Sequence, residues 1–325
     1  MELFKSESNV DFMAWRKPSL IISAILCVLA VAIVFVRGLD YGLDFEGGAM
    51  IEVHYKEPAE IADIRSSLDA AGFAGAVVQS LGSPVDYAIR IKPHHEGGEA
   101  AETAGTSEAK ATTNKIAAEV LTALTKSRSD VTIKRSEFVG ASVGEELREQ
   151  GLVAVLFVIL GIMAYLWMRF EWRFAVAAVA SEIHDTLITV GIFALTGREF
   201  DLPALAAVLS VVGYSINDKV VVFDRVREIF RASRKGEPYE ILNRSINSTM
   251  SRTIMTGLTT SLAVGTLYFV GGPALENFGL IMLIGIFVGT LSSVFFANPI
   301  LLWLGVSKQD LMPRTKEDPE LAARP

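Results

Sequence analysis

Six long runs of apolar residues dominate the pattern along the chain. Each run holds about 18 or more residues, enough for an α-helix to cross a hydrocarbon layer of about 30 Å. The runs cover residues 18–36, 151–168, 174–195, 202–223, 253–270 and 278–304. Composition agrees with this pattern, because 51% of the 325 residues are hydrophobic. The sequence therefore predicts a multi-pass α-helical membrane protein with six transmembrane helices.

The distribution of lysine and arginine orients these helices. Basic residues gather before the first run, between the second and third, between the fourth and fifth, and after the sixth, while the other short loops hold almost none. Because basic loops stay on the cytoplasmic side, we predict that both termini are cytoplasmic. The chain then divides into an N-terminus with the first helix, an outer domain, a five-helix bundle and a cytoplasmic tail, at residues 1–36, 37–150, 151–304 and 305–325.

The outer segment has the pattern of a small α+β domain. Its strand-like stretches alternate apolar and polar residues, and its two helical stretches repeat apolar residues every three or four positions. Asn114 suits the N-cap of the second helix. The predicted strands are residues 49–55, 76–81, 87–93 and 131–140, and the predicted helices are residues 59–72 and 114–126. Two helices among four strands indicate a two-layer, ferredoxin-like domain.

One stretch of the outer segment, residues 93–113, lacks any apolar period and is rich in Gly, Ala, Glu and Thr. Such a composition cannot bury a core, so we predict a disordered loop. His94 and His95 lie within it. A protein metal site needs several spaced ligands, and no spaced cysteine or further histidine supports these two. We therefore expect no bound metal.

The basic segment between the fourth and fifth runs, residues 225–252, is too long for a tight turn. Pro238 suits the first position of a helix, and Ile241, Leu242 and Ile246 then fall on one face. We predict an amphipathic helix that lies along the inner membrane surface. Its role is either a basic anchor on anionic lipid or a docking surface for a partner.

Ionisable residues inside the apolar runs carry the strongest functional signal, because such groups are costly in a membrane and usually face a bundle interior and pair. His184 and Asp185 lie near the middle of the third run, and Asp218 lies near the inner end of the fourth. Lys219 is closer to that end, so we expect its side chain to snorkel to the inner surface. Arg252 begins the fifth run on the same side, where it should meet Asp218.

Two interpretations of Asp218 and Arg252 stay open on these grounds. In a proton relay, burial favours the neutral carboxyl and the guanidinium favours the charged form, so the carboxyl takes and releases a proton as the geometry changes. In a static pin, the two residues form a permanent ion pair between helices. Further candidates for the relay are Asp185, His184, Asn217 and Asp224. A stripe of hydroxyls follows at Thr253, Thr256 and Thr260.

An enzyme is not expected. The sequence has no nucleophile-elbow motif, no zinc-ligand spacing and no phosphate-binding loop. An intramembrane aspartyl protease carries Gly-x-Gly-Asp at one aspartate, whereas residues 213–218 read GYSIND. We expect no cofactor, so an energised function must draw on an ion gradient. A proton that moves through 100 mV releases about 2.3 kcal/mol.

Four stretches are long and specific enough to compare with known families. They are YGLDFEGG (41–48), VVGYSINDKVVVFDRVRE (211–228), NRSINSTMSRTIMTGLTT (243–260) and FGLIMLIGIFVGTLSSVFFANPILL (278–302). They closely resemble the SecF family of the bacterial Sec protein translocase. The resemblance covers nearly the whole chain, from the first helix through the outer domain to the last helix.

The resemblance implies a function in protein export. SecF pairs with SecD, and the pair uses the proton motive force to promote late stages of preprotein translocation through the SecYEG channel after the action of SecA. YajC and YidC are expected associates, the location is the bacterial inner membrane with the outer domain in the periplasm, and no nucleic-acid partner is expected. Asp218 and Arg252 match the family's residues for proton conduction. The alternative is a proton-driven exporter of a small molecule or lipid, of the resistance-nodulation-division type.

Three positions depart from the pattern of the family. Lys219 stands where a small residue such as Thr is usual, Gly257 replaces a usual Ser, and Glu46 replaces a usual Thr. None of them removes the pair of Asp218 and Arg252. The glycines at the exit of the first helix are predicted to form a hinge or a close-packed joint between the membrane and the outer domain, because glycine tolerates backbone angles that other residues do not. They are Gly42, Gly47 and Gly48.

Overall fold

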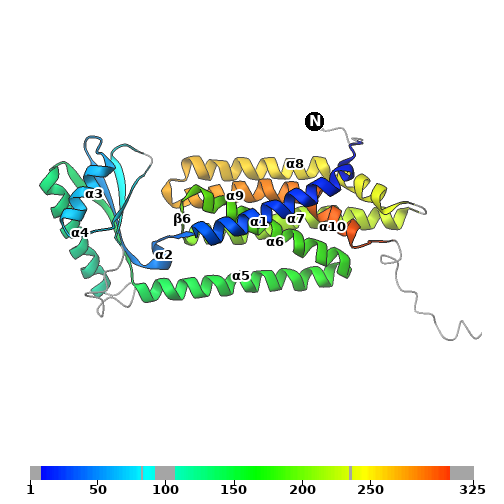
Figure 1. Cartoon of the computed structure of the whole chain (residues 1–325), viewed down its shortest axis with the longest axis horizontal. Helices are drawn as coiled ribbons and strands as arrows, with labels where there is room; N and C mark the ends of the chain where they lie inside the picture. Colours follow the sequence, from blue (N-terminus) through cyan, green and yellow to red (C-terminus); the bar gives the residue numbers. More distant parts are fainter. Residues whose placement is uncertain (1–8, 82, 92–106, 234–235, 308–325) are drawn as a thin grey trace, which may run out of the picture.

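The computed structural model describes residues 9–81, 83–91, 107–233 and 236–307. Within these residues, six helical segments are long and apolar enough to cross a membrane, which confirms the six predicted helices. They are α1 (Arg16–Arg37), α5 (Ala141–Arg169), α6 (Trp172–Thr196), α7 (Leu202–Ala232), α8 (Pro238–Val270) and α9 (Pro273–Ser292), which continues through the π-helix η3 (Ser293–Ala297) into α10 (Asn298–Trp303). Figure 1 shows them as an elongated bundle with a small domain at one end.

The small domain is a four-stranded antiparallel sheet with two helices. Its elements follow one another as β2 (Gly48–Tyr55), α3 (Ile61–Ala70), β3 (Val77–Ser80), β4 (Asp86–Ile91), α4 (Ser107–Ser127) and β5 (Val131–Val139). The strand order is β3-β4-β2-β5, which is the ferredoxin-like arrangement predicted for this segment. Alternate residues of β2 are buried, and the core they form includes Ile51, Val53, Leu68, Ile89 and Val120.

The second helix of this domain begins earlier than predicted. Helix α4 starts at Ser107, so Asn114 lies inside the helix and is not its N-cap. The last seven residues of the predicted loop are therefore helical, because this stretch is rich in Ala, Glu and Lys, which are good helix formers. The remainder of that loop, including His94 and His95, lies outside the described residues.

The segment between the fourth and fifth spans also differs from the prediction. Pro238 does begin a helix, but α8 runs without a break from there into the membrane span. Its apolar face does not lie on lipid, because Ile241, Leu242 and Ile246 are buried in a core with Phe174 and other aromatic side chains of α6 and α7. Tertiary packing therefore keeps the segment in line with the span instead of along the membrane surface.

The polar face of the same segment holds the N-terminal part of the chain. Asn247 Nδ2 donates to the Val10 carbonyl at 2.8 Å, and Asn247 Oδ1 accepts from the Val10 amide at 3.0 Å. Asn243 Oδ1 accepts from the amide of Met13 in η1 (Phe12–Trp15) at 3.3 Å. The amphipathic stretch is thus a docking surface for this chain's own N-terminus.

Helix α9 lies at the centre of the bundle, in contact with α6, α7 and α8. Close approach to α7 depends on two glycines, because small residues let helices in a membrane come close together. A Cβ built on Gly285 would lie 2.2 Å from Val211 Cγ2, and one on Gly289 would lie 2.7 Å from Ser215 Oγ. Neither position can take a side chain without moving the two helices apart. The interior polar residues of α7 therefore lie against α6 and α9.

The joint between the bundle and the outer domain is a small parallel ladder. Strand β1 (Asp40–Tyr41) follows α1 and pairs with β6 (Glu199–Phe200), which lies between α6 and α7. The short helix α2 (Leu43–Glu46) packs against the start of α5, where a Cβ on Gly144 would lie 2.9 Å from the carbonyl oxygen of Phe45. Helix α5 has 29 residues, or about 44 Å at 1.5 Å per residue, and so reaches from the bundle to this joint (Figure 1).

Candidate functional site

Helix α7 presents polar side chains to two sides of the bundle at once. Ser215 and Lys219 are one turn apart, on the face toward α6 and α9, and both are fully buried. Asp218 is 3% exposed and feels the electrostatic attraction of Arg252 on α8. Residues one turn apart share a helix face, whereas neighbours in sequence point about 100° apart. The consecutive polar residues 217–219 therefore face different parts of the protein.

Lys219 is the centre of a buried ion cluster. Its Nζ lies 2.9 Å from Glu182 Oε2, 2.7 Å from Asp185 Oδ2 and 2.7 Å from Ser215 Oγ. The prediction that Lys219 snorkels to the inner surface is thus wrong. The reason is that two carboxylates on α6 offer a closer partner than the membrane surface does, and a buried ammonium needs such partners.

Asp185 is the most strongly hydrogen-bonded carboxylate of this cluster. Its Oδ2 accepts from Lys219, from Ser215 Oγ at 2.5 Å and from Ser292 Oγ at 2.6 Å. Its Oδ1 lies 2.7 Å from His184 Nδ1. Four groups from three helices therefore converge on a single carboxylate, which suits its charged form.

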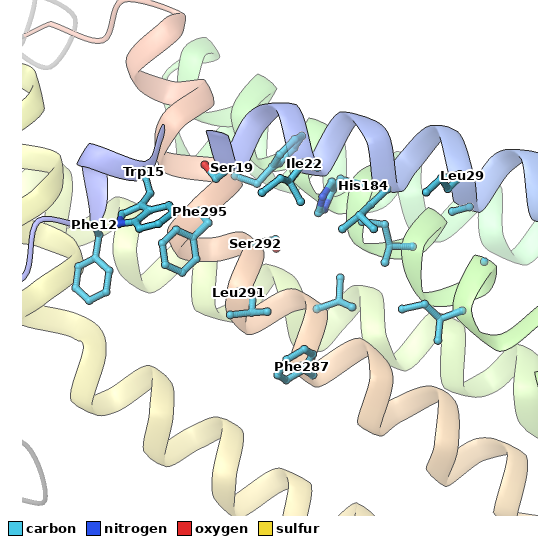
Figure 2. A pocket seen from close by; sticks show the side chains of 18 of the residues that line it. Phe12, Trp15, Ser19, Ile22, Leu29, His184, Phe287, Leu291, Ser292 and Phe295 are labelled. Atoms are coloured by element: carbon cyan, nitrogen blue, oxygen red, sulfur yellow. The ribbon is translucent and has the colours of Figure 1, made fainter. Parts of the chain in front are cut away.

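His184 connects the cluster to the side of the bundle that faces α1. Its ring stacks on Phe296 in η3, with centroids 4.1 Å apart, and its Nε2 is buried without a hydrogen-bond partner among the described residues. It lines an apolar cavity of about 670 Å³ between α1, α6 and α9. Figure 2 shows His184 beside α1, together with Ile22, Leu29 and Ser292. A π-helix such as η3 is rare and often occurs at functional sites.

Glu182 is a buried site residue that the sequence reading overlooked. It is 6% exposed, and only one of its oxygens has a partner, since Oε1 makes no hydrogen bond among the described residues. The signal was its spacing from Asp185. Residues i and i+3 share a helix face, so two carboxylates at that spacing in an apolar run call for a cation from another helix.

Asp218 and Arg252 come near one another but do not form a direct ion pair within the described part of the chain. Asp218 Oδ2 is buried without a hydrogen-bond partner, while Arg252 is exposed at the start of the membrane span of α8. The attraction of Arg252 and Lys219 reaches Asp218 through space. A buried carboxylate without a partner is rare in proteins and calls for an explanation.

Hydroxyl groups from α7, α8 and α9 gather near Asp218. A Cβ on Gly257 would lie 3.4 Å from Thr290 Oγ1 and 3.6 Å from Tyr214 Oη. Within the described chain neither buried hydroxyl has a partner of strict hydrogen-bond geometry, although Tyr214 lies close enough to Thr260 and Thr290 to interact with both. Tyr214 is one turn before Asp218 and interacts with it electrostatically. Gly257 itself adds no hydroxyl to this group, and that it replaces a usual serine stays a prediction.

Two of the lesser candidates lie away from this centre. Asn217 is exposed on α7, and no hydrogen bond joins it to Asp218 in the described region. Asp224 lies near the end of α7 that leads into the loop before α8, where it pairs with Arg169 at 2.5 Å and with Arg227 at 3.5 Å. The structure therefore brings together Asp185, His184 and Lys219 on one side of α7, and Asp218 with Arg252 on the other.

The predicted glycine joint has the geometry of a close-packed contact. A Cβ on Gly42 would lie 3.2 Å from Asp201 Cα. Gly47 and Gly48 have φ angles of 73° and 119°, which side chains with a Cβ rarely adopt. Their role as a hinge stays a prediction.

A buried arginine crosses the same joint. Arg90 on β4 is 4% exposed and lies 2.6 Å from Glu46 on α2 and 3.1 Å from Glu199 on β6. Burial raises the pKa of the Glu199 carboxyl, and the Arg90 guanidinium opposes this change. Glu46 thus serves as a partner for a buried cation.

Together the bundle, the outer domain and the buried charges define a multi-pass membrane protein with an α+β domain outside the membrane. Residues 119–307 match the family model of the C-terminal region of the protein export membrane proteins SecD and SecF, and residues 32–59 match the SecD/SecF GG motif. The SecF subunit of the protein translocase from Vibrio alginolyticus is 41% identical, over 96% of this chain and 95% of its own length. The subunit from Pseudomonas aeruginosa is 40% identical, over 95% and 96%.

A solved structure supports the same assignment. The crystal structure of SecDF from Thermus thermophilus, described as a translocon-associated membrane protein, is similar with a TM-score of 0.79 and 33% identity. The match covers 93% of this chain and 39% of the SecDF chain. The chain belongs to the SecF family and is an accessory subunit of the Sec protein translocase.

Proposed function

We propose that this subunit works with SecD to convert the proton motive force into late-stage movement of a preprotein through SecYEG, after SecA has acted. The observation that carries this proposal is the buried carboxylate of Asp218, whose Oδ2 has no hydrogen-bond partner in the described chain, near the guanidinium of Arg252. A proton is the smallest group that satisfies such a carboxylate, and a nearby cation stabilises the charged form when the proton leaves. The gradient supplies about 2.3 kcal/mol per proton and 100 mV.

An uncovered strip of small residues on α7 supports the need for a SecD subunit. Ala206, Ser210, Gly213 and Asn217 are exposed and recur every three or four positions, so they share one helix face. Small residues allow a second helix to approach closely in a membrane. The strip runs beside Asp218, so a partner seated on it controls access of water to this carboxyl.

The orientation follows from the basic loops. Both termini and the loop between α7 and α8 lie in the cytoplasm, the outer domain lies in the periplasm, and the membrane is the bacterial inner membrane. The outer domain contacts the emerging preprotein, and the bundle makes no covalent change to any substrate, so the protein is not an enzyme. The gradient replaces a cofactor, and YajC and YidC are associates.

The test measures preprotein translocation into inverted membrane vesicles with and without a proton gradient. Asp218→Asn keeps the shape of the side chain and removes the titrating group, so it should lose the gradient-dependent part while assembly with SecD survives. Arg252→Met should lose it as well, and the double variant should be scarcely worse than either single one, because the two act as a pair. Glu228→Gln is the control, because Glu228 is an exposed residue of α7, the helix that carries Asp218.

A different result would reject the relay in favour of a static pin. In that case Asp218→Asn lowers the stability of the subunit or its assembly with SecD, while the surviving complexes keep their full response to the gradient.

A further inference from the structure

We propose that Glu182 is a second proton-binding site, and that Lys219 couples it to Asp218 so that a proton on Glu182 disfavours a proton on Asp218. This inference rests on the proposed relay and adds a second carboxyl to it. Lys219 lies in direct contact with Glu182 and Asp185, and it is the chain neighbour of Asp218. One buried cation thus serves carboxylates on two sides of α7.

The charges of the cluster do not balance without a proton. Glu182 and Asp185 carry one negative charge each when ionised, and Lys219 carries one positive charge, which leaves a net charge of −1. All three side chains are less than one-tenth exposed. An uncompensated charge inside a membrane bundle is costly, so the cluster has a strong tendency to bind one proton.

Hydrogen bonding indicates which group takes this proton. Asp185 accepts from four groups and is stabilised as an anion. In the described chain His184 Nε2 and Glu182 Oε1 are both buried without a partner. Protonation of His184 would add a second cation to the interior and leave four buried charges, whereas protonation of Glu182 leaves only Lys219 and Asp185 charged, and a neutral buried group costs less than an ionised one. Glu182 has Lys219 as its single hydrogen-bond partner in the described chain, and its Oε1 is free. Protonation of Glu182 at Oε1 neutralises the cluster and breaks no contact with Asp185.

The surroundings contain few other groups that respond to pH. Helix α5 faces Glu182 with Ile159, Ile162 and Met163, which line a small apolar cavity. Helix α9 contributes the hydroxyl of Ser292, and Cys27 on α1 lies within electrostatic range of Asp185. The remaining titratable or charged groups that face the cluster or Asp218 are His184 on α6, Tyr214 on α7 and Arg252 on α8.

The coupling follows from Coulomb's law. While Glu182 is ionised, the cluster has a net charge of −1, which opposes the field of Lys219 at Asp218 and favours a proton there. When Glu182 is neutral, the field of Lys219 at Asp218 is no longer opposed by this carboxylate, and the charged form of Asp218 is favoured. Low polarity in the bundle interior makes such interactions stronger than in water. Binding of a proton at one site therefore promotes its release at the other.

Infrared difference spectroscopy tests this coupling without any translocation assay. The full chain, purified with SecD and placed in lipid vesicles, is titrated with acid, and the carboxylic-acid band of Asp218 is obtained by subtraction of the Asp218→Asn spectrum. The same subtraction is made in the Glu182→Gln background. We expect a smaller protonated fraction of Asp218 in that background at every pH of the transition, because glutamine imitates the neutral acid. Glu228→Gln should leave the fraction unchanged.

Two further measurements extend the test, and the second of them does not depend on the assembly of Glu182→Gln. The double variant Lys219→Met with Glu182→Gln removes the shared cation, so the protonated fraction of Asp218 should rise above that of the wild type. In the wild type itself, the transition of Asp218 should be broader than that of a single independent site, because two sites that oppose one another titrate over a wider range.

The proposal fails if the protonated fraction of Asp218 is the same or larger after Glu182→Gln. It also fails if the wild type minus Glu182→Gln difference shows no carboxylic-acid band at any pH. Either result rejects the coupling and leaves the role of Asp218 in the relay intact. By contrast, a normal gradient response of Asp218→Asn in vesicles rejects the relay, and the coupling between the two carboxyls can still be measured by infrared spectroscopy.

Discussion

Removal of the Lys219 ammonium directly measures how much the buried ion cluster contributes to the stability of the folded protein. Lys219→Met keeps the length and apolar stem of the side chain but leaves Glu182 and Asp185 buried without their cation. Lys219 is 0% exposed, and its three contacts lie at 2.7–2.9 Å. The loss of one partner of a buried ion pair costs about 3–5 kcal/mol. A snorkelling lysine at the same position would change the free energy of unfolding by about 0.5 kcal/mol or less.

The assay is thermal unfolding of the purified subunit in mild detergent at a fixed heating rate. At about 2 °C per kcal/mol for a chain of this size, the unfolding temperature should fall by roughly 6–10 °C at neutral pH. The loss should shrink as the pH falls, since the two orphaned carboxylates then bind protons more tightly in the folded than in the unfolded state.

A second substitution separates this explanation from a general packing defect. Glu182→Gln in the Lys219→Met background removes one of the two orphaned charges, so the double variant should regain more than half of the lost stability. The reasoning is refuted if Lys219→Met unfolds within about 1 °C of the wild type, or if the added Glu182→Gln makes the single variant less stable.

Other predictions concern the packing and the joint. Gly285→Ala should lower the free energy of unfolding by about 1–3 kcal/mol because its Cβ meets Val211, whereas Gly265→Ala, with open space around it, should be neutral in the same thermal assay. Arg90→Met should accelerate amide hydrogen exchange in β1 and β6, and Arg135→Met, at an exposed position, should not. Equal exchange rates in the two variants would argue that the ion pairs of Arg90 do not hold the outer domain to the bundle. Gly47→Val should impair translocation without loss of membrane insertion. Normal translocation by this variant would contradict the role of Gly47 in the joint.

Helices and strands that depend only on the local pattern of apolar and polar residues could be predicted from the sequence. Runs of about 20 apolar residues can only be helices in a membrane, since every backbone group must be satisfied within the segment. The ferredoxin-like domain follows from two helices among alternating strands. The early start of α4 was missed although its helix formers are a local signal, because the loop composition around them was given more weight. The continuity of α8 could not be predicted in this way, because Pro238 begins a helix equally well along a membrane surface or as part of a membrane span.

The candidate site likewise contains residues that could be predicted from the sequence and residues that could not. Asp218 and Arg252 were found because each is an ionisable residue at a known depth. The burial of Lys219 depends on Glu182, which is 37 residues away on another helix, and no local pattern reports such a distance. The π-helix at Ser293–Ala297 and the stack of His184 on Phe296 likewise arise from packing between helices.

Proton flux through the complex tests the central claim most directly. The subunit and its SecD partner are placed in vesicles with a pH-sensitive dye inside, and a membrane potential is imposed. The wild type and Glu228→Gln should acidify the interior at equal rates, and Asp218→Asn should fall to the rate of empty vesicles. An Asp218→Asn complex that carries protons as fast as the wild type would contradict the assignment of Asp218 as the carrier.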